Sequence, residues 1–353
     1  MHEAHLGMKR IWRPIALVAA LAFLALSFIN ASWLAPGPRG AIKLLAHRGV
    51  MQLSVEGKAE CSATRIEPPH HDFIENTIAG IDEARRNGAR MIEIDPVATA
   101  DGKIALFHDQ TLDCRTNGKG PVRAATMAQL KALDAGYGYT ADGGKSYPLR
   151  SKGVGLIPEL REALTLIGDG AVLYNFNSDD PAEADRLIAA LAAAGRNVVA
   201  HGDGFSAPAP LQARFRSAFP KAWIFDDEGA AACTSAYLKA GWLGLTPDVC
   251  RGGTIAIPIN YQWAFAGWPN RLIARMEAVG ARVIVIGPYE NGVARGLDLP
   301  EQIGEVPAGF NGYLWTDDIR TIGPALRPAL NRRNPPQEAA LAKALERRRA
   351  GRD

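Results

Sequence analysis

Cysteine is scarce in this chain of 353 residues, and the four that it has do not form a metal-binding pattern. Cys61, Cys114, Cys233 and Cys250 stand far apart, with no CxxC or CxH pair among them. This spacing disfavours a zinc site. In an oxidising compartment the four would pair as two disulfides, and the sequence leaves the three possible connectivities open. Among these we favour Cys61 with Cys114 and Cys233 with Cys250.

The chain also lacks a broad field of one charge, because its formal net charge is only +3. The excess of basic residues lies at the two ends, before residue 36 and after residue 331, so the part between them is slightly acidic. A polynucleotide-binding protein needs an extended basic surface. Nucleic acid is therefore excluded as a partner, whereas a small substrate with a single phosphate is not.

Long hydrophobic runs are absent except for one near the N-terminus. Residues 15–29 form an apolar run in which Ser27 is the one polar residue; the run follows Lys9, Arg10 and Arg13 and continues less strictly to Ala35. This pattern is typical of a retained membrane anchor or of a cleaved secretory signal, with a buried core helix as the remaining alternative. Because basic flanks stay in the cytoplasm, we expect the rest of the chain in the periplasm or extracellular space, anchored to the cytoplasmic membrane or secreted.

The sequence predicts three parts. Residues 1–35 form the signal anchor or signal peptide, 36–330 form one catalytic barrel, and 331–353 form a basic C-terminal tail. We expect the tail to be a solvated terminus, with contact to anionic lipid headgroups as the alternative. No internal repeat indicates a further unit, and the oligomeric state is not predicted.

Short apolar runs alternate with helical stretches along the central part, which is typical of a parallel sheet covered by helices. Eight such runs are present, the number that closes a (β/α)8 TIM barrel, so the predicted fold class is α/β. The expected strands are Ile42–Ala46, Met91–Asp95, Ala171–Phe176, Val198–Ala200, Ala222–Phe225, Trp242–Leu245, Arg282–Ile286 and Gly312–Trp315.

Two further segments are expected near the active-site face of the barrel. Ile104–Phe107 follows an Asp-Gly turn and is predicted to be one arm of a small hairpin rather than a ninth barrel strand. Tyr137–Gly155 is rich in glycine and predicts a long loop over one face, and loops of this length are commonly functional.

Polar side chains gather at the ends of the first two expected strands. His47 and Arg48 follow the first strand, and Glu93 and Asp95 are two residues apart in the second, so both carboxylates face the same side. Two such carboxylates repel each other unless a cation lies between them, and hard oxygen ligands select calcium or magnesium. We therefore predict a site for one divalent cation, Ca²⁺ or Mg²⁺, with Glu93 and Asp95 as ligands.

Two histidines and an arginine complete the predicted chemistry. His47 and His108 are suited to proton transfer near neutral pH, one taking a proton from an attacking hydroxyl and the other giving one to the leaving oxygen. Arg48 is suited to bind the non-bridging oxygens of a phosphate with its planar fork of donors. Each residue alone is more commonly structural, but together they indicate phosphoryl chemistry.

The order of these motifs resembles that of the glycerophosphodiester phosphodiesterase family, over most of residues 43–318. The resemblance implies a (β/α)8 barrel with one divalent cation, a histidine acid and base, and hydrolysis of glycerophosphodiesters to glycerol phosphate and an alcohol. The matching motifs are His47-Arg48-Gly49, Glu75-Asn76-Thr77, Glu93-Ile94-Asp95, Asp101-Gly102, His108-Asp109 with Thr111-Leu112-Asp113, Gly155-Leu156-Ile157-Pro158-Glu159-Leu160 and Thr316-Asp317.

The chain departs from the family pattern on the third expected strand. Where the family has a glutamate and a lysine two residues apart, this chain has Asn175 and Asn177, so a metal ligand loses its charge and a phosphate-binding cation is missing. The amide oxygen of Asn175 still suits calcium, and Asn177 remains a candidate for the pocket. His201 and Asp203, after the fourth expected strand, are candidates to replace the lost polar contacts, with ordinary loop residues as the equal alternative.

The segment between His47 and Glu75 is longer than in the bacterial family and includes Cys61. Because Cys114 stands where the family usually has an arginine, a Cys61–Cys114 disulfide would hold this insertion beside the pocket. The resemblance implies that Glu75 lies near the metal or the glycerol moiety. Its neighbour Asn76 is a candidate for the pocket and, equally, for a helix cap.

Two other segments allow more than one interpretation. His70 and His71 in the insertion are expected to be exposed loop residues, with contact to the metal or the substrate as the alternative. The aromatic stretch Tyr261–Trp268 is expected to pack in the core or to cover the bottom of the barrel. At the top of the barrel, or facing the bilayer, it would instead admit an acyl chain. Two alternatives to the hydrolase therefore stay open: a phospholipase of the same fold that acts on lipid, and a catalytically weak protein that binds phosphodiesters.

Overall fold

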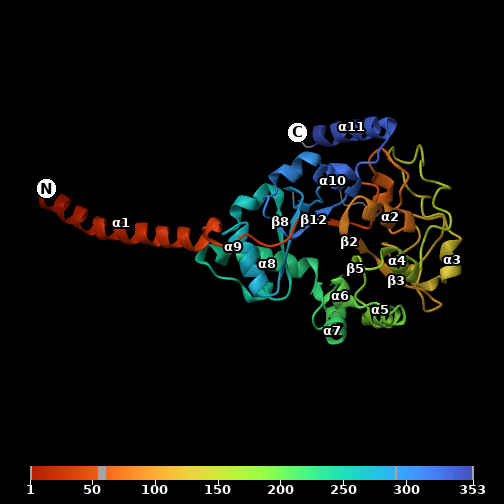
Figure 1. Ribbon diagram of the computed structural model, residues 1–353, viewed down its shortest axis with the longest axis horizontal. Helices are drawn as coiled ribbons and strands as arrows, with labels where there is room; N and C mark the ends of the chain where they lie inside the picture. The colour runs from red at the N-terminus through yellow and green to blue at the C-terminus, as the bar shows by residue number, and fades with distance from the viewer. Residues whose placement is uncertain (1, 55–60, 291, 352–353) are drawn as a thin grey trace.

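The computed structural model, which describes residues 2–54, 61–290 and 292–351, contains a nearly closed barrel of parallel strands covered by helices (Figure 1). Eight strands follow one another around the sheet in chain order, so the prediction of a (β/α)8 barrel is confirmed. The strands are β1 (Lys43–Ala46), β2 (Ala89–Ile94), β5 (Ala171–Asn175), β6 (Gly204–Ser206), β7 (Trp223–Phe225), β8 (Thr254–Pro258), β9 (Arg282–Ile286) and β12 (Tyr313–Thr316).

The sheet is not hydrogen-bonded between its two end strands, β7 and β8. A side-chain hydrogen bond spans this opening, because the indole Nε1 of Trp223 donates to Oγ1 of Thr254 over 2.9 Å. The main helices around the barrel are α2 (Ile78–Arg86), α4 (Leu160–Ile167), α5 (Pro181–Ala193), α7 (Ala209–Ala218), α8 (Asp227–Ala240), α9 (Asn270–Ala278) and α10 (Ile319–Leu326), and two shorter ones are α3 (Met127–Lys131) and α6 (Val198–His201).

Alternation of side chains along the strands builds two separate cores. Leu45 and Met91 point into the barrel, where they join side chains from other strands, including Ile284. Their neighbours along the chain, such as Leu44 and Ile92, belong instead to the large cluster between the strands and the surrounding helices. Successive residues of a strand face opposite sides, so one set packs inside the barrel and the other packs against the helices. Both faces of these strands are therefore apolar.

Two of the expected strands are wrong. Val198–Ala200 lies in the short helix α6, because the side chain of Asn197 accepts a hydrogen bond from the Ala200 N–H and caps it. The fourth barrel strand is β6, whose residues Gly204–Ser206 are too few to show an alternating pattern. Trp242–Leu245 falls largely in a 3-10 turn after α8, and the sixth strand is β8.

A hairpin and a long loop lie beside the barrel as expected. Strands β3 (Pro96–Ala98) and β4 (Ile104–Leu106) pair antiparallel outside the barrel sheet, and a second two-stranded pair joins β10 (Tyr289–Glu290) to β11 (Val293–Ala294). The hairpin packs on a third hydrophobic cluster, which includes Tyr139 of the glycine-rich loop. Residues 55–60 of the preceding insertion lie outside the described residues.

The four cysteines form two disulfides in the structure, Cys61 with Cys114 and Cys233 with Cys250. These are the pairs favoured from the sequence. The first joins the insertion to the loop after β4, and the second joins α8 to the segment that precedes β8.

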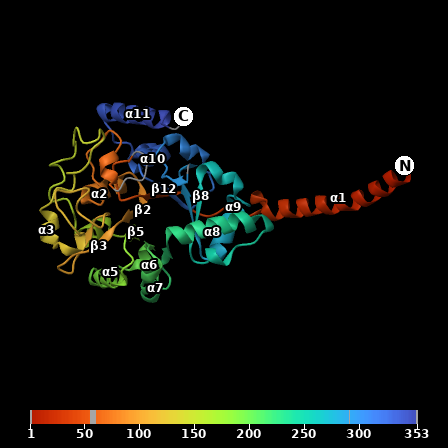
Figure 2. The ribbon, with the colours of Figure 1, turned by 180° about the vertical axis from the view of Figure 1, so that it is seen from behind.

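The N-terminal helix α1 (His2–Asn30) extends away from the barrel in both views (Figures 1 and 2). Its end is tied to the body, where the guanidinium of Arg275 donates to the Ile29 carbonyl over 3.2 Å. None of the helices in the described part of the chain has the length and apolar character that crossing a membrane requires. The predicted membrane anchor, and the localisation drawn from it, is thus wrong.

The C-terminal segment is a docked helix rather than a solvated tail. Helix α11 (Pro335–Ala350) begins with a capping box and buries Leu341 on its inner side. Arg348 is also buried, and its guanidinium pairs with Glu67 over 2.8 Å and with Asp318 over 2.7 Å. The basic composition of this segment predicted exposure, but one of its arginines, Arg348, belongs to a buried ion-pair network.

His70 and His71, expected to be exposed, are instead partly buried near that network. Burial lowers the pKa of His70 to about 4 and, together with the neighbouring His70, lowers that of His71 to about 3. Nδ1 of His71 lies 3.0 Å from the amide nitrogen of Gln52. Both imidazoles therefore stay neutral in the folded protein at pH values where free histidine is protonated.

We expect the free energy of unfolding to fall as the pH is lowered from 6.5 towards 4. In this range the unfolded chain binds protons at both histidines and the folded chain does not, so acid favours unfolding. Each histidine contributes about 1 to 2 kcal/mol of this loss at pH 5. Urea unfolding at pH 7 and pH 5 measures it. His71→Gln should reduce the difference between the two pH values, and His201→Gln should not; equal differences in all three proteins would contradict the assignment.

Candidate active site

The loop after β1 forms a tight turn that aims Arg48 at the carboxyl end of the barrel. Arg48 has a φ of 55° and Gly49 a φ of 75°, so both adopt the left-handed conformation. A Cβ at Gly49 would lie 3.1 Å from the backbone of Gly80, which explains why glycine stands there. The strained conformation of Arg48 is held by the contacts of its side chain and backbone.

Arg48 is surrounded by carboxylates. Its backbone N–H donates to Oε2 of Glu93 over 2.6 Å, and its guanidinium lies 3.0 Å from Oε1 of Glu75 and 3.6 Å from Oδ2 of Asp95. Burial alone would lower the pKa of this guanidinium, but Glu75 and Asp95 raise it. The arrangement keeps a permanent positive charge in a buried site, as binding a phosphate requires.

Glu93 and Asp95 are both buried at the end of β2, and their environments differ. Burial and the nearby Asp95 raise the pKa of Glu93 well above its usual value. Burial would also raise the pKa of Asp95, but Arg48 and hydrogen bonds from amide groups lower it. Asn76 provides one of these bonds, donating from Nδ2 to Asp95 over 2.7 Å, and its Oδ1 accepts the Asp95 N–H. Asn76 therefore holds Asp95, while Thr77 caps α2.

Each predicted catalytic histidine is paired with a carboxylate through Nδ1. Nδ1 of His47 lies 2.6 Å from Oδ1 of Asp317, which follows β12, and the second oxygen of Asp317 accepts the Gly296 N–H. Nδ1 of His108 lies 2.7 Å from Oδ1 of Asp109. Because Nδ1 is engaged in both residues, proton exchange with a substrate falls to Nε2.

Asn175 and Asn177 reach the same carboxylate. Their Nδ2 atoms lie 3.0 Å and 3.2 Å from Oδ1 of Asp95, and Asn177 also donates to the carbonyl oxygen of His108. The two amides therefore contact Asp95 where the family pattern has charged side chains. As a result the negative charge of Asp95 is partly balanced by hydrogen bonds rather than by a lysine.

Part of this donor set suits a divalent cation. Oε1 of Glu93 is buried and has no hydrogen-bond partner among the described residues. A carboxylate oxygen in this state is available to bind a cation. Glu93, Asp95 and the amide oxygen of Asn175 are hard donors. No group of three histidine, cysteine or acidic side chains that could hold a metal ion occurs in the described ranges. Glu93, Asp95 and Asn175 suit calcium or magnesium. Together they carry one negative charge fewer than three carboxylates would.

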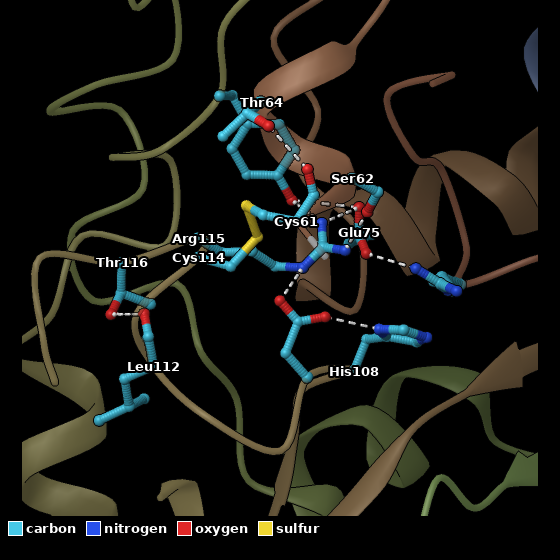
Figure 3. The surroundings of a disulfide bond; sticks show 12 residues. Cys61, Ser62, Thr64, Glu75, His108, Leu112, Cys114, Arg115 and Thr116 are labelled. Carbon is cyan, nitrogen blue, oxygen red and sulfur yellow. Dashed lines mark hydrogen bonds and ion pairs between the residues drawn. A yellow bond between two sulfur atoms is a disulfide. The ribbon is translucent and has the colours of Figure 1, made fainter. Parts of the chain in front are cut away.

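Arg115, which the sequence did not single out, lies next to Glu75 on the side of the site that carries His108 (Figure 3). It is 3% exposed, and its guanidinium contacts Glu75 over 3.0 Å and Asp109 over 2.9 Å. The phenol of Tyr139 contacts both Arg115 and Glu75. Together Arg115 and Arg48 overcome the effect of burial and lower the pKa of Glu75 to about 2. The available sequence signals were indirect: Arg115 directly follows Cys114, and Tyr139 lies in the glycine-rich segment 137–155 that was expected to be a functional loop.

His201 and Asp203 are not brought to the site. Both precede β6, so they lie at the amino end of the barrel strands, opposite to His47 and Asp95. Asp203 pairs with Arg196 over 2.7 Å and accepts the N–H of Val172 at the start of β5. The prediction that they contribute to the pocket is wrong because the expected fourth strand, which they were thought to follow, is a helix.

Part of the chain is similar in sequence to known proteins. Residues 66–202 match the glycerophosphoryl diester phosphodiesterase family. A glycerophosphodiester phosphodiesterase of Bacillus subtilis is 39% identical over 123 residues, which are 33% of this chain and 41% of that protein. Glycerophosphodiester phosphodiesterase 1 of Rattus norvegicus is 32% identical over 128 residues, 36% of this chain and 31% of that protein. The aligned stretches therefore span less than half of these relatives.

Solved structures extend the likeness of the fold to the whole barrel. A glycerophosphodiester phosphodiesterase of Agrobacterium tumefaciens superposes with a TM-score of 0.53 at 22% identity, covering 81% of this chain and 99% of that one. A phosphodiesterase of Oleispira antarctica in complex with its product sn-glycerol 3-phosphate gives 0.52 at 18% identity, covering 80% and 96%. This chain therefore resembles the glycerophosphoryl diester phosphodiesterase family in sequence over residues 66–202, and its barrel shares the fold of these solved structures.

Proposed function

We propose that this chain hydrolyses glycerophosphodiesters to glycerol phosphate and an alcohol. The observation that carries the proposal is the placement of two carboxylate-paired histidines, His47 and His108, at the same end of the barrel as the partly buried guanidinium of Arg48. A product complex with sn-glycerol 3-phosphate in a phosphodiesterase of the same fold supports the substrate class.

In the proposed reaction Arg48 binds the non-bridging oxygens of the phosphate and stabilises the charge that develops on them. One histidine removes a proton from the attacking water molecule through Nε2 as the new phosphorus–oxygen bond forms. The other donates a proton to the alcohol oxygen as its bond to phosphorus breaks. Asp317 and Asp109 hold the two rings in the required tautomer and orientation.

We further propose that one divalent cation binds to Glu93 and Asp95, with the amide oxygen of Asn175 as a third donor. Such an ion would polarise a phosphoryl oxygen. The amide of Asn175 donates to Asp95 in the structure, so it must turn its oxygen towards the ion. The neutral charge of Asn175 and the need for its amide to turn both predict a weaker metal site than three carboxylates would form.

Release of glycerol phosphate tests the proposal. The purified chain is incubated with a panel of glycerophosphodiesters and one lysophospholipid, with Ca²⁺, with Mg²⁺ and with a chelator, and phosphorus NMR follows the products. We expect glycerol phosphate from at least one glycerophosphodiester in the presence of an ion, and little with the chelator. Turnover of the lysophospholipid alone would replace the proposed substrate class by a lipid.

Replacing Asn175 by glutamate should strengthen metal binding. The change adds the missing carboxylate next to Glu93 and Asp95, and affinity for a divalent ion grows with the charge of its ligands, so we expect about a tenfold lower Kd. Isothermal titration with Ca²⁺ and Mg²⁺ measures this independently of turnover. Asn175→Gln keeps the amide and serves as the matched control; an unchanged Kd in Asn175→Glu would remove Asn175 from the metal site.

A catalytically weak phosphodiester-binding protein is the second candidate. The observation in its favour is that Asn175 and Asn177 both donate to Asp95, so the carboxylate is partly balanced by amides. This candidate predicts that sn-glycerol 3-phosphate binds with similar affinity with and without an ion, and that no phosphodiester in the panel is cleaved.

A further inference from the structure

We propose that Arg115 is a positioning residue that sets the geometry of both His108 and Arg48, and that the Cys61–Cys114 disulfide holds it in place. The inference rests on the proposed hydrolysis, in which those two residues touch the substrate. It assigns a role in turnover to a buried side chain and to a disulfide, neither of which lies among the residues that carry the chemistry.

The guanidinium of Arg115 lies between two carboxylates that each contact one residue of the site. On one side its Nε donates to Oδ2 of Asp109 over 2.9 Å, and the other oxygen of Asp109 binds Nδ1 of His108. On the other side its Nη1 lies 3.0 Å from Oε2 of Glu75, whose other oxygen accepts from Arg48. The planar guanidinium of Arg115 therefore fixes the distance between His108, the acid-base residue, and Arg48, the phosphate-binding residue.

The contacts of Arg115 are buried and directional. Besides the two carboxylates, Nη1 donates to the phenol of Tyr139 over 2.9 Å and Nη2 donates to Oγ of Ser62 over 2.7 Å. A lysine has a single ammonium group and cannot reach all four partners, whereas the rigid fork of an arginine can. Burial makes each lost partner costly, so the position tolerates few alternatives.

The disulfide anchors this arrangement from both ends. Cys114 directly precedes Arg115, and Cys61 directly precedes Ser62, so the covalent bond joins the residues next to a donor and its acceptor (Figure 3). The glycine-rich loop closes on the same point, because a Cβ at Gly138 would overlap the carbonyl oxygen of Cys114. Without the disulfide, the insertion that carries Ser62 loses its covalent tie to the loop that carries Arg115.

A double-mutant cycle tests the inference, with kcat for glycerophosphodiester hydrolysis as the readout. Arg115→Met should lower kcat by about 100-fold, the effect expected when reacting groups shift by about 1 Å. Removing the disulfide with Cys61→Ala and Cys114→Ala should lower kcat by about tenfold. If the disulfide acts through Arg115, the two effects are coupled, so Arg115→Met should cost no more than about tenfold in the disulfide-free protein.

Two controls separate positioning from general loss of structure. Cys233→Ala with Cys250→Ala removes the other disulfide, at the amino end of the barrel, and should leave kcat within about twofold of the wild type. Arg115→Lys keeps the charge and should recover part of the activity lost in Arg115→Met. Thermal unfolding of every variant shows whether it is folded at the assay temperature.

The outcomes distinguish this inference from the proposed function. If the wild type turns over and the losses in kcat from Arg115→Met and from removal of the disulfide are strictly additive, the coupling is overturned and the proposed hydrolase function still stands. If the wild type does not turn over, titration with sn-glycerol 3-phosphate repeats the same cycle, because Arg115 should position Arg48 for the phosphate in either case. A protein that neither turns over nor binds this ligand would overturn both proposals.

Discussion

Replacing His108 by alanine lowers kcat by about 100-fold to 10,000-fold, the contribution expected of a positioned general acid or base. The same loss is expected for His47→Ala. Both rings are fixed by a carboxylate, Asp109 for His108 and Asp317 for His47, so neither can replace the other. Steady-state kinetics on a glycerophosphodiester, at the metal concentration that saturates the wild type, measures the effect.

The fold should tolerate these two substitutions, because both histidines are partly exposed at the open end of the barrel. His201→Ala is the matched control: it removes a histidine from the opposite end and should leave kcat unchanged. Turnover of either His47→Ala or His108→Ala at the wild-type rate would remove that histidine from the reaction.

Replacing Arg48 by methionine lowers the free energy of unfolding by about 3 to 5 kcal/mol, as expected when a buried ion pair loses one partner. Glu75 and Asp95 would keep their negative charges in a buried site with one cation fewer. The same change removes the proposed phosphate ligand, so the affinity for sn-glycerol 3-phosphate should fall as well. Chemical denaturation and titration calorimetry measure the two effects separately.

Arg48→Lys is the informative comparison. It retains the charge, so most of the stability should return, but a single ammonium group cannot serve Glu75 and a phosphate as a planar fork does. We therefore expect stability near that of the wild type with ligand affinity still reduced. Unchanged stability in Arg48→Met would show that the surrounding carboxylates are balanced by other groups.

The site was largely predictable where its residues follow strands in short motifs. His47, Arg48, Glu93 and Asp95 stand at strand ends, and the carboxyl ends of parallel strands meet at one end of a barrel. The same argument wrongly placed His201 and Asp203 in the pocket, because the β-branched residues before them form a helix capped by Asn197 rather than a strand. Local propensity cannot decide between strand and helix in so short a segment.

The partners of these residues were less predictable because they depend on tertiary contacts. Asp317 was visible as part of a motif, but its pairing with His47 arises only when the last strand closes beside the first. Arg115 and Tyr139 come from loops without periodicity, and Arg348 comes from a helix whose composition indicated exposure. In each case a charged or polar side chain is buried because a partner far along the chain compensates for the loss of water.

The most direct test of the account is to incubate the wild-type chain and the His47→Ala/His108→Ala double variant with the same glycerophosphodiester and divalent ion. Phosphorus NMR follows the conversion of the diester to a phosphate monoester. The account predicts that the wild type releases glycerol phosphate and that the folded double variant releases none above the buffer control. Equal release by both proteins, or none by the wild type with any diester and ion, would contradict it.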